Sequence, residues 1–268
     1  MLVLLVIFLI LRRRGIRCYF EELPIPEIVD HSVIVSLTTS PSRSRKIAST
    51  LYSLLDQSYP LEIEIHIPVS SEYKFPERVI NHPNIKIISH AEDPGPSMKY
   101  IPAVLKANKD IIVVNDDMIY PRDLNEHFVT SIRKLPDYVY ANRGNRFVND
   151  TNNSEAISSA YLVNPVQVAI VTGGYVIPKK IASQLRHLIN DYSTAPPEAK
   201  LMDDIWISGN LTKLGIKKFV LPGLKRHANS VITFSSTQEI QPGKLISYFK
   251  WAPDEIIKND IVNNSIFD

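Results

Sequence analysis

The chain has 268 residues, of which 44% are hydrophobic and 22% are charged, an ordinary composition for a folded domain. This length is enough to bury one full core and predicts one domain. The formal net charge of +2 is too small to indicate a nucleic acid as a partner, and no basic stripe is interleaved with aromatic residues. Cys18 is the single cysteine, which excludes an internal disulfide.

The N-terminus differs from the rest in composition. Residues 2–11 are apolar without interruption, and three arginines, Arg12 to Arg14, come directly after them. The run is shorter than the roughly 20 apolar residues that span a bilayer, and a secretory signal would carry its positive charge before the run. We expect residues 1–14 to be an uncleaved membrane anchor or interfacial segment, with a frayed extension as the alternative. The arginines favour a cytoplasmic position for the folded domain on their C-terminal side.

Residues 15–30, which include Pro24 and Pro26, are expected to form a linker, and residues 31–268 a single domain. Strands are predicted at 33–37, 63–67, 85–88, 111–114, 138–140, 168–177 and 219–221, and helices near 47–55, 101–105, 121–132, 181–189 and 205–214. The polar, Asn-rich stretch 142–159 is predicted to be a mobile loop. The alternation predicts an α/β fold with a mainly parallel, Rossmann-like sheet and helices on both faces.

The segment Asn115-Asp116-Asp117 comes directly after the most strand-like run of the chain. Ligands of parallel sheets bind outside the carboxyl ends of the strands, and two carboxylates there can bind a hard cation such as Mg²⁺ or Mn²⁺. Such an ion can bridge a diphosphate. A solvated turn is the alternative, because Asn and Asp favour turns.

Two further segments carry charged groups next to predicted helices. In the segment 93–99, prolines and Gly95 stiffen a loop ahead of a helix, and Lys99 could meet an anion such as a diphosphate there; a surface lysine is the alternative. Asp203 and Asp204 begin another helix, where one could cap the helix and the other act as a general base.

Three other features are ambiguous. Gly173-Gly174 interrupts a predicted strand, which indicates either close approach of a ligand or a plain bulge. His227 could be a third metal ligand or a structural histidine. Arg43 could meet phosphate or be solvated.

Taken in order, these motifs resemble the GT-A glycosyltransferases, particularly small family-two-like members of bacteria, algae and large viruses. The resemblance runs from about Val33 to Leu221 and rests on the segments 35–43, 56–58, 93–99, 115–121, 173–175 and 203–206. It implies a GT-A fold, a nucleotide-sugar donor, a glycan or lipid-linked hydroxyl acceptor, and Mn²⁺ or Mg²⁺.

The resemblance also implies roles for individual residues. The donor site would comprise Thr38, Thr39, Ser40, Arg43, Asp93, Gly95, Pro96, Lys99, Asn115 and Asp116. The metal would be held by Asp117, with Asn115 and His227 as further ligands. Asp204, or else Asp203, would be the base of an inverting transfer. Gly173, Gly174, Tyr175 and Trp206 would form the acceptor side.

One position departs from the resemblance, since Asn115 stands where similar proteins usually carry a third aspartate. An amide removes one negative charge, so metal affinity could be lower. Two other functions remain open: a metal-dependent nucleotidyltransferase, which the absence of glycine after the first strand disfavours, and a non-catalytic protein of the same fold that binds a sugar or nucleotide.

Overall fold

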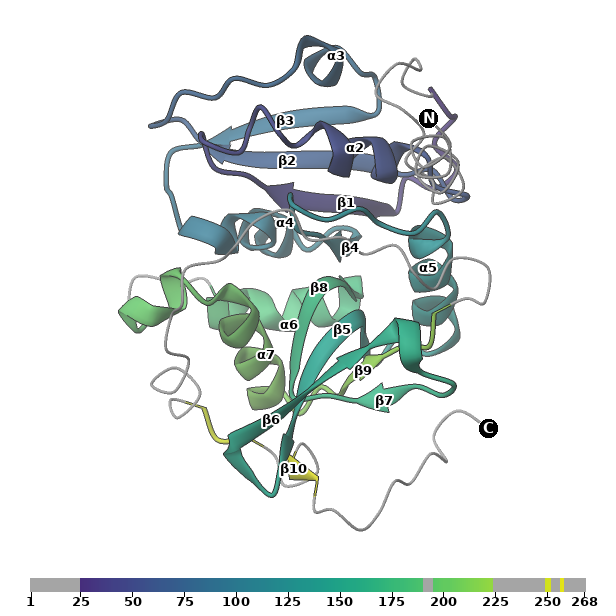
Figure 1. Ribbon diagram of the computed structural model, residues 1–268. Helices are drawn as coiled ribbons and strands as arrows, with labels where there is room; N and C mark the ends of the chain where they lie inside the picture. The colour runs from purple at the N-terminus through teal and green to yellow at the C-terminus, as the bar shows by residue number, and fades with distance from the viewer. Residues whose placement is uncertain (1–24, 190–194, 224–248, 252–255, 258–268) are drawn as a thin grey trace, which may run out of the picture.

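The computed structural model describes residues 25–189, 195–223, 249–251 and 256–257 (Figure 1). The strands are β1 (Val33–Thr38), β2 (Glu62–Pro68), β3 (Ile85–His90), β4 (Asp110–Val113), β5 (Val139–Val148), β6 (Asp150–Ser158), β7 (Val166–Gln167), β8 (Ile170–Ile177), β9 (Lys218–Val220) and β10 (Ile256–Ile257). The α-helices are α2 (Ala48–Leu55), α3 (Glu77–Ile80), α4 (Ile101–Lys106), α5 (Leu124–Lys134), α6 (Lys179–Ile189) and α7 (Asp203–Lys213). Short 3₁₀ turns are η1 (Gly95–Lys99), η2 (Ser159–Tyr161) and η4 (Pro197–Lys200).

One ten-stranded sheet joins the described strands in the order β3-β2-β1-β4-β8-β5-β9-β7, with β6 and β10 paired to β5. Strands β3, β2, β1 and β4 run parallel, and β8 enters antiparallel between β4 and β5. The predicted α/β class with a mainly parallel sheet is therefore confirmed.

Hydrophobic side chains on the two faces of the sheet form two cores. Ile101, Leu185 and Ile207 belong to the core under α4, α6 and α7. Leu51 and Phe128 belong to the core on the other face, under α2 and α5. Helices thus cover both faces, as the alternation of strands and helices predicted.

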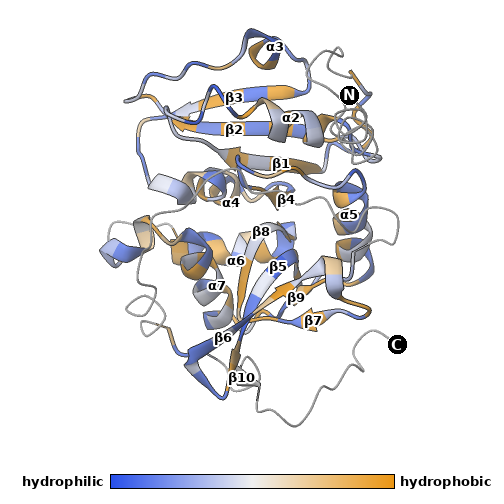
Figure 2. Cartoon of the chain, viewed as in Figure 1, coloured by the Kyte–Doolittle hydropathy of each residue, from blue (hydrophilic) through white to orange (hydrophobic). Residues whose placement is uncertain are grey.

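The prediction of a loop at 142–159 is wrong, because β5 continues to Val148 and turns back as β6. Asn149, with φ of 65°, makes the turn in the left-handed region that asparagine tolerates. Most β6 side chains are exposed, and most of the strand has the hydrophilic colour in Figure 2. Main-chain pairing with β5 stabilises this strand without the alternating burial by which a strand can be recognised from sequence.

Some predictions fall on residues that the structure does not describe. These are the apolar run 2–11, most of the linker, and His227. Within the described ranges, no helix combines the length and the hydrophobicity needed to cross a membrane.

Candidate active site

The carboxyl ends of β1 and β4 form one edge of the sheet, because these strands pair in parallel from Val33–Asp110 to Ser36–Val113. A cavity of about 770 Å³ opens beyond that edge. It is lined by all ten residues predicted to bind the donor, by the three aspartates Asp117, Asp203 and Asp204, and by residues that include Tyr73, Asn145, Phe147 and Thr172.

Asp116 is the buried anchor of the acidic segment at the end of β4. Its carboxylate is held by Arg43, whose Nε donates to Oδ2 at 3.0 Å and whose Nη2 contacts Oδ1, and by Thr39, whose hydroxyl donates at 2.5 Å. Thr50 donates to its main-chain oxygen at 2.8 Å. Burial raises the pKa of Asp116, and Arg43 and Thr39 offset only part of that rise. Asp116 therefore joins the β4 end to the loop after β1, and Arg43 also reaches Asp117 Oδ2 at 3.3 Å.

Lys99 brings three distant stretches of the chain together. Its Nζ lies 2.6 Å from Asp203 Oδ2 and 3.2 Å from Asp204 Oδ1, and it donates to Asn115 Oδ1 at 2.9 Å. Only 7% of the lysine side chain is exposed. The segments at 93–99, 115–117 and 203–204 therefore meet around one buried ammonium group.

Asp203 and Asp204 both contact the Lys99 ammonium group but differ in burial. Burial acts to lower the pKa of Lys99, but Asp203 and Asp204 outweigh it and raise that pKa, so Lys99 is a cation. Burial raises the pKa of Asp203 to about 6, and the like charge of Asp204 contributes to this rise. The Lys99 cation offsets part of it. Asp204 has the more exposed side chain, 25% against 11%. Thr172 donates to its Oδ2 at 2.6 Å.

The first turn of α7 holds both aspartates, where negative charge interacts favourably with the helix dipole. The N-cap is Met202, which makes no side-chain capping hydrogen bond. Capping therefore accounts for neither aspartate.

Gly173 and Gly174 form a bulge in β8, because the two together oppose the single residue Asn142 between the Ala141–Tyr175 and Arg143–Thr172 pairs. Both have positive φ, 73° and 149°. The bulge presents the Gly173 oxygen to the buried Tyr120 hydroxyl, which donates at 2.8 Å and accepts from the Asn115 N–H at 2.7 Å. The bulge thus fixes the start of the acidic segment through Tyr120.

The residues predicted for the acceptor side do not line the larger cavity, whereas those predicted for the donor do. Tyr175 and Trp206 are buried, with exposures of 1% and 4%. Neither they nor Gly173 and Gly174 line this cavity or the smaller cavity that contains Asn142 and Arg143. Their role at the acceptor stays a prediction.

Several polar residues at the site were not assigned a role from the sequence, among them Thr172, Tyr120 and Tyr73. Thr and Tyr are common residue types inside or next to an apolar strand, where nothing local separates a site residue from a core residue. The glycine pair beside Thr172 was the available signal, because a bulge commonly redirects side chains near active sites.

The described residues of the cavity can supply part of the ligand set of a divalent cation. Within the described ranges, no group of three or more His, Cys, Asp or Glu side chains could hold a metal. Asp117 lines the cavity and can supply one carboxylate. Mg²⁺ is commonly held by one or two carboxylates together with substrate phosphates, so the groups present suit a cation that enters with a diphosphate.

Comparisons with known proteins bear on the fold. No family model and no curated protein matches the sequence. Among solved structures, the chain is similar to the crystal structure of GalNAc-T7 with UDP, GalNAc and Mn²⁺, at a TM-score of 0.52 and 12% sequence identity. The match covers 71% of this chain and 42% of the other, so the chain spans less than half of that protein's length. The described part of the chain has a GT-A-like fold.

Proposed function

We propose that the chain is a glycosyltransferase that moves a sugar from a nucleoside-diphosphate sugar to a hydroxyl group of a glycan or lipid-linked acceptor. One observation carries the proposal: acidic segments from β4 and α7 meet with Lys99 and Arg43 in a single cavity at the carboxyl edge of the sheet. A GT-A-like fold supports it, because a glycosyltransferase with UDP and Mn²⁺ in its structure has this fold.

The donor is assigned to the cavity of about 770 Å³. Its charged lining comprises two cations, Arg43 and Lys99, and five aspartates. A diphosphate would therefore enter an environment with excess negative charge, which a divalent cation at Asp117 would balance. Tyr73, which stacks on Phe75 with ring centroids 5.7 Å apart, offers an aromatic face to the nucleobase.

Asp204 is assigned as the general base, because it is the more exposed carboxylate of the pair and Lys99 and Thr172 hold both of its oxygens. The acceptor oxygen bonds to the anomeric carbon as the bond from that carbon to the phosphate oxygen breaks. Asp204 takes the hydroxyl proton, and the electron pair of the broken bond leaves with the nucleoside diphosphate. Bound Mn²⁺ or Mg²⁺ would supply Lewis-acid stabilisation of the leaving diphosphate. Attack from the side opposite the phosphate inverts the anomeric centre.

Thermal-shift binding tests the donor assignment. A panel of nucleotide sugars with Mn²⁺ should raise the melting temperature of the wild type for at least one nucleotide. Asp117→Asn should lose that Mn²⁺-dependent rise, and Asp137→Asn should keep it, since Asp137 is an exposed residue paired with Lys180. A full shift in Asp117→Asn, or no shift with any nucleotide sugar, would overturn the assignment.

A further inference from the structure

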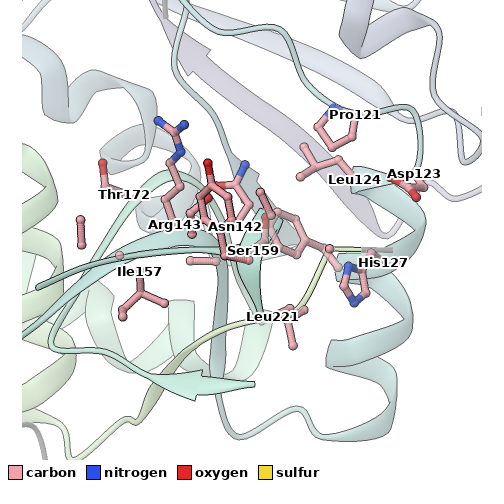
Figure 3. Close-up of a pocket in the computed structure, with 18 of the residues that line it drawn as sticks. Pro121, Asp123, Leu124, His127, Asn142, Arg143, Ile157, Ser159, Thr172 and Leu221 are labelled. Carbon is pink, nitrogen blue, oxygen red and sulfur yellow. The ribbon is translucent and has the colours of Figure 1, made fainter. Parts of the chain in front are cut away.

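The smaller cavity, of about 490 Å³, lies beside the larger one, and Thr172 and Asn145 line both. Most of its lining comes from α5, β5, β6 and the turn η2. Figure 3 shows Arg143 and Thr172 on one side of it and Asp123 and His127 on the other. A cavity of this size is typical of a small-molecule site.

Two side chains of the lining are charged at pH 7, Arg143 and Asp123, because burial lowers the pKa of His127 and so leaves that side chain neutral. Asp123 directly precedes α5, and the helix dipole stabilises a negative charge there. Arg143 is half-buried and has neither an ion pair nor a side-chain hydrogen bond among the described residues. Its guanidinium group is always charged and offers five donor hydrogens to a ligand.

The β8 bulge holds Arg143 in this position. A Cβ on Gly173 would lie 3.2 Å from Arg143 Cδ, so the stem of the arginine packs against the bare backbone of the bulge. Arg143 pairs with Thr172 on β8 and with Ser158 on β6, so the three side chains share one face of the sheet. Both neighbours line the cavity, and Thr172 donates to Asp204 Oδ2 at 2.6 Å. Arg143 therefore lies next to the threonine that is bonded to the proposed base.

The charges of the lining select the class of ligand. One guanidinium group matches one carboxylate in a bidentate pair. A phosphate monoester carries about −1.5 to −2 charges at pH 7, and its excess charge would meet Asp123 in the same cavity and Asp204 beside Thr172. Asp123 can instead accept a hydrogen bond from a hydroxyl group, as can the amide oxygen of Asn145. A ligand with one carboxylate and several hydroxyl groups fits these features better than a neutral sugar, which would leave Arg143 without an anion.

We infer that the smaller cavity binds the acceptor and that Arg143 selects an acceptor sugar that carries a carboxylate, as a uronic acid does. The inference rests on the proposed function and names the class of acceptor, which that function leaves open. With its carboxylate at Arg143, such a sugar lies beside Thr172, a residue that lines both cavities and donates to the proposed base. A hydroxyl group of this sugar, or of its neighbour in a glycan, can then approach Asp204.

Binding of simple glycosides tests the inference. Methyl uronides of several configurations are titrated against the full chain by ligand-observed NMR, each beside the neutral methyl hexoside and the hexose 6-phosphate of the same configuration. At least one uronide should bind the wild type at least about tenfold more tightly than its matched hexoside, because a hydrogen-bonded ion pair replaces a neutral contact.

Three variants locate that preference. Arg143→Met keeps an unbranched stem over Gly173 and removes the guanidinium group, so it should abolish the preference and change hexoside affinity by less than about twofold. Arg143→Lys keeps a cation without the bidentate geometry and should retain a preference of about two- to fivefold. Arg146→Met is the matched control, because Arg146 lies on the same strand, pairs with Glu155 and lines neither cavity; it should bind as the wild type does.

The preference is a ratio of two affinities on one preparation, so a partial loss of folded protein does not change it. The inference would be overturned if no uronide bound the wild type better than its hexoside, or if a hexose phosphate bound more tightly than every uronide. It would also be overturned if Arg143→Met kept the preference or if Arg146→Met lost it equally. Failure of the proposed function has a different signature, since no nucleotide sugar would then bind the wild type, whatever the uronides do.

Discussion

Asp203 and Asp204 share one ammonium group and differ in burial. In the proposed function, Asp203, the more buried, neutralises Lys99, and Asp204, the more exposed, takes the proton of the incoming hydroxyl. Asp204→Asn removes the only proton acceptor assigned at the reacting centre. We expect it to lower turnover by at least about 100-fold with donor affinity changed by less than about threefold. Donor titration and turnover assays on the same preparation measure both, and wild-type turnover in the variant would contradict the assignment.

The raised pKa of Asp203 also predicts how stability depends on pH. Its folded value of about 6 lies above the ordinary 3.8, so the folded chain binds more protons than the unfolded chain between these values. The free energy of unfolding should therefore fall as pH rises from 4 to 6. Asp203→Asn should remove this contribution, which is up to about 3 kcal/mol. Urea unfolding at pH 4 and pH 7 measures it, and a difference from wild type that does not change with pH would refute it.

Arg43 and Asp116 should be energetically coupled, because a buried carboxylate without its partner is costly. Asp116 has a side-chain exposure of 2%, against 39% for Arg43. We expect Arg43→Ala to destabilise the fold by about 1–3 kcal/mol and Asp116→Asn in the same background to recover part of that loss. Urea unfolding of both single variants and of the double variant completes the cycle. Strictly additive effects would show that the pair is not coupled.

At the scale of elements, the β8 bulge links the core to the site. A Cβ on Gly174 would lie 3.1 Å from Tyr120 Cε1, whereas one on Gly215, whose φ is also positive, meets nothing within 4 Å. Gly215→Ala, at a φ of 69° and with no contact, should cost about 1 kcal/mol, whereas Gly174→Ala, at a φ of 149° and against Tyr120, should cost about 2–4 kcal/mol. Urea unfolding compares them, and equal losses would mean that the contact with Tyr120 does not matter.

The same elements show how far the sequence predicts the structure. Apolar periodicity predicts the parallel strands and their helices, since their side chains are buried in regular patterns. It does not predict β6, whose side chains face solvent and whose stability comes from main-chain pairing. Several residues that line the larger cavity follow the carboxyl ends of strands, so their proximity could be predicted, whereas their roles at the donor were implied by the resemblance alone. The smaller cavity could not be predicted, because it depends on the register of the bulge between β5 and β8.

At the scale of the molecule, the cavity that we propose for the donor has an excess of negative charge, which disfavours a diphosphate without a cation. Five aspartates and two cations line it. Removing divalent ions with EDTA should weaken binding of the nucleoside diphosphate by at least about tenfold and change binding of the free nucleoside by less than about twofold. Calorimetric titration of both ligands tests this, and equal affinities with and without EDTA would exclude a role for the cation.

If the segments that meet at Lys99 form one centre that cleaves a nucleotide sugar, the chain should release nucleoside diphosphate from the donor selected by thermal shift, with water or a glycoside as acceptor. We expect Mn²⁺-dependent release by the wild type and by Asp137→Asn, and at least about 100-fold slower release by Asp204→Asn. Binding of the donor with no release by the wild type, or equal release by Asp204→Asn, would contradict this expectation.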